Sequence, residues 1–240
     1  MTQRLFTDLF RLADRRLLAR NWRVAGGLML CLAMPVLPAV AANSGAPAAD
    51  NVLPQPARSL QGARNWRDVS AWVRASDDNG GKPFAIIDKK AATVQIFGAT
   101  GDWRASSPVL LGLAVGDESV PGIGERKMAD IKPHERTTPA GRFVSEPGVN
   151  LQGEDIVWID YDAAVSMHRV RTSNKADRRL QRLATPTVAD NRISYGCVNV
   201  PAAFYDRFIK PVFGAAPAVV YVLPETHALS ALPGLHRPQP

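Results

Sequence analysis

The sequence contains little cysteine: Cys31 and Cys197 are the only two in 240 residues. Cys31 lies in an apolar N-terminal stretch that has the pattern of a removable leader, so the mature chain is expected to carry one thiol. One thiol excludes a framework of intramolecular disulfides. Cys197 then has two explanations: it is a small apolar core residue, or it is a reactive group.

The sequence also lacks a long, uninterrupted apolar run that would clearly span a membrane. Residues 24–40 give 17 apolar positions, interrupted by Gly26, Gly27, Pro35 and Pro38, whereas a spanning helix needs about 17 to 25. Six arginines precede the run, and small residues follow it up to Ala42. This pattern predicts a signal peptide at residues 1–42 and an exported protein of the periplasm or cell envelope. An uncleaved anchor, with membrane contact through the leader alone, is the alternative.

Positive charge is scarce once the leader is set aside. The leader holds six of the 29 basic residues and two of the 22 acidic ones, so the net charge falls from +7 to +3. This excess is too small to indicate a nucleic-acid partner. It suits contact with an anionic polymer of the cell envelope.

The remaining chain divides by composition. Residues 43–63 are rich in Ala and Pro with no hydrophobic period, which predicts a flexible linker. Residues 64–224 are expected to form the folded domain. Residues 225–240 are rich in Pro and read as a disordered tail.

Short apolar or β-branched segments bounded by Gly and Pro dominate the folded part. The expected strands are residues 84–88, 93–97, 108–115, 156–161, 164–169 and 218–223, and the expected short helices are residues 65–74, 174–183 and 201–209. This order predicts a mainly β fold, an antiparallel sandwich or barrel-like arrangement with a few short helices.

The segment around Cys197 suits a nucleophile. Gly196 allows an unusual backbone turn, so that amides near Cys197 can converge on a developing oxyanion. Pro201 marks a helix start, and we expect a strand-to-helix transition whose amides favour the thiolate.

A thiol nucleophile usually requires a base, and the chain has four histidines. His227 and His236 lie in the predicted tail. His134 lies in a loop, whereas His168 ends an alternating run that predicts a strand. We therefore expect His168 to be the base, with His134 as the alternative.

Three ordered motifs resemble the L,D-transpeptidase (YkuD-type) catalytic domain family. They are His168 on a strand, the run Ser194-Tyr195-Gly196-Cys197-Val198-Asn199, and an upstream turn at residues 138–143 with the sequence Thr-Pro-Ala-Gly-Arg-Phe. The resemblance covers roughly residues 84–223. Tyr195 departs from the histidine that many members carry before the glycine.

The resemblance implies an enzyme that acts on peptidoglycan stem peptides. Cys197 would attack the carbonyl before a terminal D-alanine, form a thioester and pass the acyl group to an amine. His168 would be the base, and amides at Gly196 and Cys197 would bind the oxyanion. No metal or organic cofactor is implied. The expected substrate-binding residues are Arg192, Ser194, Tyr195 and Asn199.

Three points stay open at this stage. Water could replace the amine, which would make the protein a carboxypeptidase or a hydrolase of wall-linked protein. The protein could also be a wall-binding module with a silent thiol. The insert between His168 and Ser194 is rich in Arg, and it is either a basic lid that binds stem carboxylates or a solvated helix face.

Overall fold

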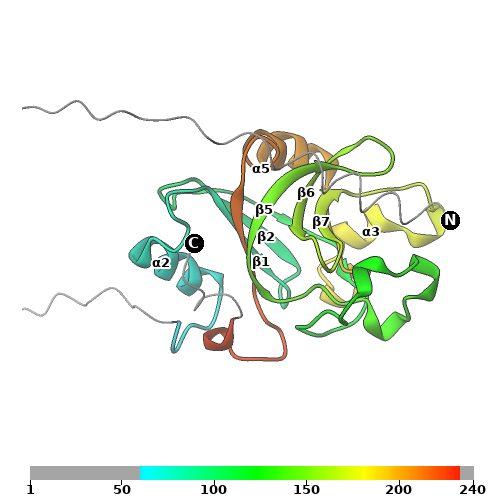
Figure 1. Cartoon of the computed structure of the whole chain (residues 1–240), viewed down its shortest axis with the longest axis horizontal. Coiled ribbons are helices and arrows are strands. Elements are labelled where there is room, and N and C mark those ends of the chain that lie inside the picture. Colours follow the sequence, from blue (N-terminus) through cyan, green and yellow to red (C-terminus); the bar gives the residue numbers. More distant parts are fainter. Residues whose placement is uncertain (1–59, 233–240) are drawn as a thin grey trace, which may run out of the picture. The chain divides into compact units, whose positions relative to one another are not determined.

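The computed structural model describes residues 60–232 (Figure 1). The predicted signal peptide and residues 43–59 of the predicted linker lie outside these residues, as do residues 233–240. Within them, the protein is mainly β with short helices, as the sequence predicts. None of the described helices is both long and apolar enough to cross a membrane.

One mixed sheet of eight strands forms the body of the domain. Its order is β3 (Trp103–Pro108), β2 (Thr93–Phe97), β1 (Phe84–Asp88), β10 (Ala218–Val222), β5 (Gly141–Val149), β6 (Asp155–Asp160), β7 (Val165–Arg169) and β9 (Val198–Val200). Most neighbours are antiparallel, as expected, but β1 pairs with β10 and β7 with β9 in parallel. The sheet is therefore mixed.

The two edges of this sheet are joined by one bridge, so the sheet is nearly closed. Leu110, which follows β3, exchanges two backbone hydrogen bonds of 2.9 Å with Asn199 of β9. The expected strand at 108–115 is limited to this bridge and to β4 (Leu111–Gly112), which pairs with β8 (Arg192–Ser194). This contact brings the chain that follows β3 beside the segment that carries Cys197.

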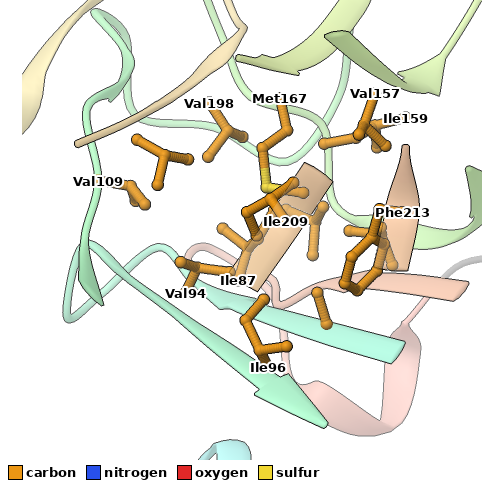
Figure 2. Close-up of a cluster of buried hydrophobic side chains, with 14 of the residues drawn as sticks. Ile87, Val94, Ile96, Val109, Val157, Ile159, Met167, Val198, Ile209 and Phe213 are labelled. Atoms are coloured by element: carbon orange, nitrogen blue, oxygen red, sulfur yellow. The ribbon is translucent and has the colours of Figure 1, made fainter. Parts of the chain in front are cut away.

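β1 and β10 are buried on both faces, which explains their almost uninterrupted apolar sequences. Ala85 and Ile87 face one core, while Phe84 and Ile86 face another. Figure 2 shows the first core, in which Met167 of β7 lies among side chains that include Ile87, Ile209 and Phe213.

The second core lies under α2 (Trp66–Ser76), which the sequence predicts at 65–74. Asn65 caps this helix by accepting from the amides of Arg67 and Asp68, and the Asp68 carboxylate accepts from the amide of Asn65 in return. Trp72 then packs edge-on against Tyr221 of β10. The cap and the apolar face together fix the helix on the sheet.

The predicted helix at 201–209 consists of three short pieces: α4 (Ala202–Phe204), the π-helical turn η6 (Tyr205–Ile209) and α5 (Lys210–Phe213). Pro211 has no N–H to continue the α-helical ladder, which accounts for the irregular winding before it. Tyr205, Ile209 and Phe213 are nevertheless fully buried in the first core.

Residues 225–232, the described part of the predicted tail, pack on the domain. The carboxylate of Asp117 accepts hydrogen bonds from the amides of Glu225, Thr226 and His227. Leu232 is buried in the second core. These long-range contacts give no signal in the local composition from which the tail was predicted.

Candidate active site

Cys197 lies on a short loop between β8 and β9, and its side chain is half-buried. The helix that follows begins at Ala202, after the three residues of β9. The expected strand-to-helix transition at the thiol is therefore corrected: a strand separates the two, and helix amides do not explain the chemistry of Cys197.

Gly196 has a φ of 133°, a region that side chains rarely adopt. A Cβ at this position would also lie 2.7 Å from the carbonyl oxygen of Thr137. Only glycine satisfies both constraints, which explains its place before Cys197.

The turn at 138–143 holds this loop from the other side. The hydroxyl of Thr138 donates to the carbonyl oxygen of Gly196 at 2.8 Å and accepts from the amide of Gly112 at 2.9 Å. Thr138 is fully buried. The two motifs singled out in the sequence, 58 residues apart at this bond, therefore form one structure.

Ser194 shapes the loop from within. Its hydroxyl donates to the carbonyl oxygen of Cys197 at 2.6 Å and accepts from the amide of Gly196 at 3.1 Å. Its exposed fraction is 3%. The structure thus gives Ser194 a role within the loop instead of direct contact with a substrate, and it occupies the Gly196 amide expected to bind an oxyanion.

The neighbouring strand β7 presents Ser166 and His168 to the Cys197 loop. The register of β7 against β9 places His168 opposite Asn199. The hydroxyl of Ser166, two residues earlier on β7, lies 3.6 Å from the sulfur of Cys197. Parallel pairing of two short strands therefore brings together a thiol, a hydroxyl and an imidazole.

This surrounding lowers the pKa of the Cys197 thiol. Burial acts to raise the pKa, but hydrogen bonding and charge interaction with His168, together with hydrogen bonds from Ser166, outweigh it. A thiol with a lowered pKa is more often the thiolate, which is the nucleophilic form. The site therefore favours reactivity over the alternative of an inert core cysteine.

His168 is held at both ring nitrogens. Nδ1 lies 2.7 Å from the carbonyl oxygen of Arg169, and Nε2 lies 3.3 Å from Nδ2 of Asn199. The same amide nitrogen lies 3.3 Å from the carbonyl oxygen of Cys197. Asn199 has an exposed fraction of 1% and links His168 to the Cys197 loop.

Tyr195 remains half-exposed beside the thiol. The guanidinium of Arg136 stacks over its ring, 3.9 Å from the centroid. Arg136 also donates to the carbonyl oxygen of Ile131 through Nε and Nη2. The ring is thus held in place with one face covered, an arrangement that suits the predicted substrate-facing wall.

The expected substrate contact of Arg192 is corrected by the structure. Its guanidinium is 8% exposed, forms an ion pair with Glu225 and donates to the carbonyl oxygen of Lys89 at 3.0 Å. These partners lie 33 and 103 residues away in sequence, so sequence alone gave no sign that the charge is used internally.

Most arginines of the insert between His168 and Ser194 form ion pairs or hydrogen bonds with other residues of the domain. Arg169 pairs with Asp155 and Asp206, and Arg171 pairs with Glu154. Arg179 pairs with Asp177 and donates to Asn199. Arg178 is exposed. The pairs of Arg169 and Arg171 link the insert to the rest of the domain, and the charges of the paired arginines are partly neutralised within the protein.

The alternative base makes no hydrogen bond within this arrangement. His134 is exposed in η3 (Pro133–Glu135). Its ring has no hydrogen bond to Cys197 among residues 60–232. Over the same residues, no group of three or more His, Cys, Asp or Glu side chains is arranged to hold a metal ion.

Two residues of the site were missed in the sequence. Ser166 could have been found, because it precedes His168 by two positions on a predicted strand and so shares its face. Arg179 carried no local signal, since its bond to Asn199 spans 20 residues across an irregular segment.

Comparison of the sequence with family models and with curated proteins found no match. The fold is similar to several solved structures. The L,D-transpeptidase of Mycobacterium smegmatis is 17% identical over 59% of this chain and 58% of its own, with a TM-score of 0.32. The helical cell shape determining protein Pgp2 of Campylobacter jejuni is 14% identical over 60% and 48%, with a TM-score of 0.40.

A third structure is the catalytic domain of the Enterococcus faecium L,D-transpeptidase, 17% identical over 60% of this chain and 98% of its own, with a TM-score of 0.32. The chain spans about half the length of the first solved structures it matches. Several of these proteins bear the name of the family that the sequence motifs resemble. Identities of 14 to 17% and TM-scores of 0.32 to 0.40 do not assign an activity to this chain.

Proposed function

We propose that the protein is a cysteine-dependent L,D-transpeptidase that acts on peptidoglycan stem peptides. The observation that carries this proposal is the placement of the Cys197 thiol beside Ser166 and His168, with a lowered thiol pKa. The motifs at 138–143 and 194–199 support the choice of family. The periplasm or cell envelope is the proposed location, reached through the signal peptide at 1–42.

In the first half-reaction, His168 takes the proton of Cys197 and the sulfur attacks the carbonyl carbon that precedes the terminal D-alanine. A carbon–sulfur bond forms and the carbon–nitrogen bond to D-alanine breaks. His168 returns the proton to the departing amine. The product on the enzyme is a thioester.

In the second half-reaction, an amine of a neighbouring stem peptide attacks the thioester carbon. The new carbon–nitrogen bond forms, the thiolate leaves, and the amine proton passes to His168. Water in place of the amine gives a free carboxylate by the same steps, so the acceptor decides between transfer and hydrolysis.

The oxyanion of each half-reaction needs a donor, and the amide of Gly196 already donates to Ser194. We therefore assign this role to the amide of Cys197, for which the described residues offer no acceptor. Tyr195, beside the thiol and stacked on Arg136, is assigned to contact the substrate. Ser194 and Asn199 are assigned to shape the site.

The test uses a carbapenem as an acyl donor and the mass of the intact protein as the readout. The wild-type protein should gain the mass of one carbapenem, and Cys197→Ala should gain none. Cys197→Ala is a conservative control because alanine is close in size to cysteine and the contacts of the thiol with Ser166 and with the carbonyl oxygen of Ala164 are long, 3.6 and 3.7 Å. Equal adducts on both proteins, or none on the wild type, would falsify the assignment of Cys197.

Digestion of peptidoglycan by the protein, followed by mass analysis of the muropeptides, identifies the acceptor. New crosslinks or exchanged D-amino acids indicate transfer to an amine, while shortened stems alone indicate hydrolysis. Unchanged muropeptides from a protein that nevertheless binds peptidoglycan would favour the wall-binding module with a silent thiol.

A further inference from the structure

We propose that Arg179, which lies in the insert, is a positioning residue that sets the tautomer of His168 by fixing the side-chain amide of Asn199. The inference rests on the proposed function only in that His168 is the base. It assigns the insert a task in the site that differs from binding a substrate carboxylate.

Arg179 is the first residue of α3 (Arg179–Ala184) and its side chain is 18% exposed. Nε donates to the carboxylate of Asp177 at 2.8 Å, and Nη1 donates to Oδ1 of Asn199 at 2.6 Å. A guanidinium has donors and no acceptor, so the atom of Asn199 that faces it must be the amide oxygen. The ion pair with Asp177 holds the guanidinium in this direction.

The orientation of Asn199 then decides which nitrogen of His168 carries the proton. With its oxygen turned to Arg179, Asn199 turns its NH₂ group to Nε2 of His168, 3.3 Å away. An NH₂ group only donates, so Nε2 must be the acceptor and lack a proton in the neutral ring. The proton lies on Nδ1 and is donated to the carbonyl oxygen of Arg169 at 2.7 Å.

This tautomer is the one that suits a base. The unprotonated nitrogen, Nε2, lies on the side of Asn199 and the Cys197 loop, and its lone pair takes the thiol proton when it gives up the 3.3 Å hydrogen bond from Asn199. Without Arg179, only the 3.3 Å hydrogen bond from Nδ2 to the carbonyl oxygen of Cys197 favours this orientation, and the amide of Asn199 can turn over to present its oxygen to Nε2. That oxygen stabilises a proton on Nε2, and the neutral ring then has no lone pair there to receive the thiol proton.

The test is long-range ¹H–¹⁵N NMR of the full-length protein, with His168→Gln used to assign the ring signals. In the wild type, Nδ1 should have the ¹⁵N shift of a protonated nitrogen and Nε2 that of an unprotonated one. Arg179→Met should move the two shifts toward each other. Arg178→Met, an exposed neighbour with the same net charge change, should leave them unchanged, and Arg179→Lys should restore much of the wild-type pattern.

The rate of acylation by a carbapenem gives a second readout. Arg179→Met should lower it by about 10- to 100-fold, toward the lower end of what a general base contributes. A wild-type ring protonated on Nε2, or unchanged ¹⁵N shifts in Arg179→Met, would overturn the inference, even if acylation slows. The NMR result does not depend on acylation, so failure of the proposed function and failure of this inference remain distinguishable.

Discussion

The buried ammonium of Lys89 donates to the carbonyl oxygen of Thr138 at 2.8 Å. The same ammonium donates to the carboxylate of Asp117 at 2.7 Å and to the carbonyl oxygen of Gly116. Because the Thr138 hydroxyl donates to the carbonyl oxygen of Gly196, Thr138 connects the buried ammonium of Lys89 to the loop that carries Cys197. The stability of the domain and the geometry of the thiol are therefore linked.

Replacing Lys89 by Met should lower the free energy of unfolding by about 3 to 5 kcal/mol, because the buried carboxylates of Asp117 and Glu225 lose their shared cation. Denaturation at neutral pH measures the change. The matched control is Lys90→Met, since Lys90 is adjacent and exposed; it should shift stability by no more than about 0.5 kcal/mol. Similar losses for the two variants would contradict a structural role for Lys89.

The buried carboxyl of Asp117 predicts sensitivity to acid. Burial favours the neutral form, but hydrogen bonds from Lys89, Thr226 and the amides of Glu225 and Thr226 outweigh it and hold the pKa of Asp117 well below its usual range. A pKa depressed in the folded state stabilises the protein above the unfolded pKa of about 3.9, and this stabilisation is lost as the pH falls toward the folded value.

Unfolding by urea between about pH 5 and pH 2 measures this dependence. The wild-type free energy should fall steeply below about pH 4, and Asp117→Asn should flatten the curve. Asp162→Asn is the control because Asp162 is exposed, and it should keep the wild-type slope. If Asp117→Asn kept that slope as well, the acid sensitivity would have to come from other carboxylates.

His168→Ala should slow acylation of Cys197 by about 100- to 10,000-fold, the range that a general base contributes. The rate of carbapenem adduct formation, followed by mass, measures the effect. His134→Ala should leave the rate unchanged, because His134 is exposed and makes no hydrogen bond to the thiol among the described residues. The reverse result would make His134 the base.

The pH dependence of thiol alkylation offers an independent readout of the same pair. Because the pKa of Cys197 is lowered, the alkylation rate of the wild type should reach half its maximum below the usual thiol pKa of about 8.5. Removal of His168 leaves burial, which raises the pKa, without its largest opposing interaction. His168→Ala should therefore shift the midpoint to higher pH; a midpoint that stayed in place would remove His168 from the explanation.

Gly196→Ala should destabilise the protein and abolish acylation. The positive φ costs about 1 to 3 kcal/mol for a residue with a side chain, and the added Cβ meets the carbonyl oxygen of Thr137. Gly122→Ala is the control, since Gly122 also has a positive φ, 72°, but open space at the Cβ position. Gly196→Ala should have a lower thermal unfolding temperature than Gly122→Ala and should form no carbapenem adduct. Equal unfolding temperatures and equal adduct formation would mean that the close approach to Thr137 is unimportant.

Much of the fold could be predicted because its central strands carry strong local signals. β1, β6 and β10 contain short apolar runs, and β7 alternates. β3 and β5 were missed because polar residues and Pro, and in β5 also Gly, interrupt their sequences, and these strands gain their conformation from pairing with neighbours. The parallel pairings were also missed, since they depend on contacts between distant parts of the chain.

The site shows the same division. Cys197, Gly196 and His168 were expected from local motifs to lie together, and the structure brings them together. The partners that orient them could not be predicted in this way. Arg192 was expected to bind substrate, whereas its guanidinium pairs with Glu225, 33 residues later in the chain.

The parallel pairing of β1 with β10 also has a consequence for how the chain is made. Phe84 pairs with Val219, so the middle of the sheet stays incomplete until nearly all of the domain has left the ribosome. A topology built on such distant pairs folds slowly. Any truncation before residue 218 therefore removes a central strand, β10, instead of trimming an edge of the sheet.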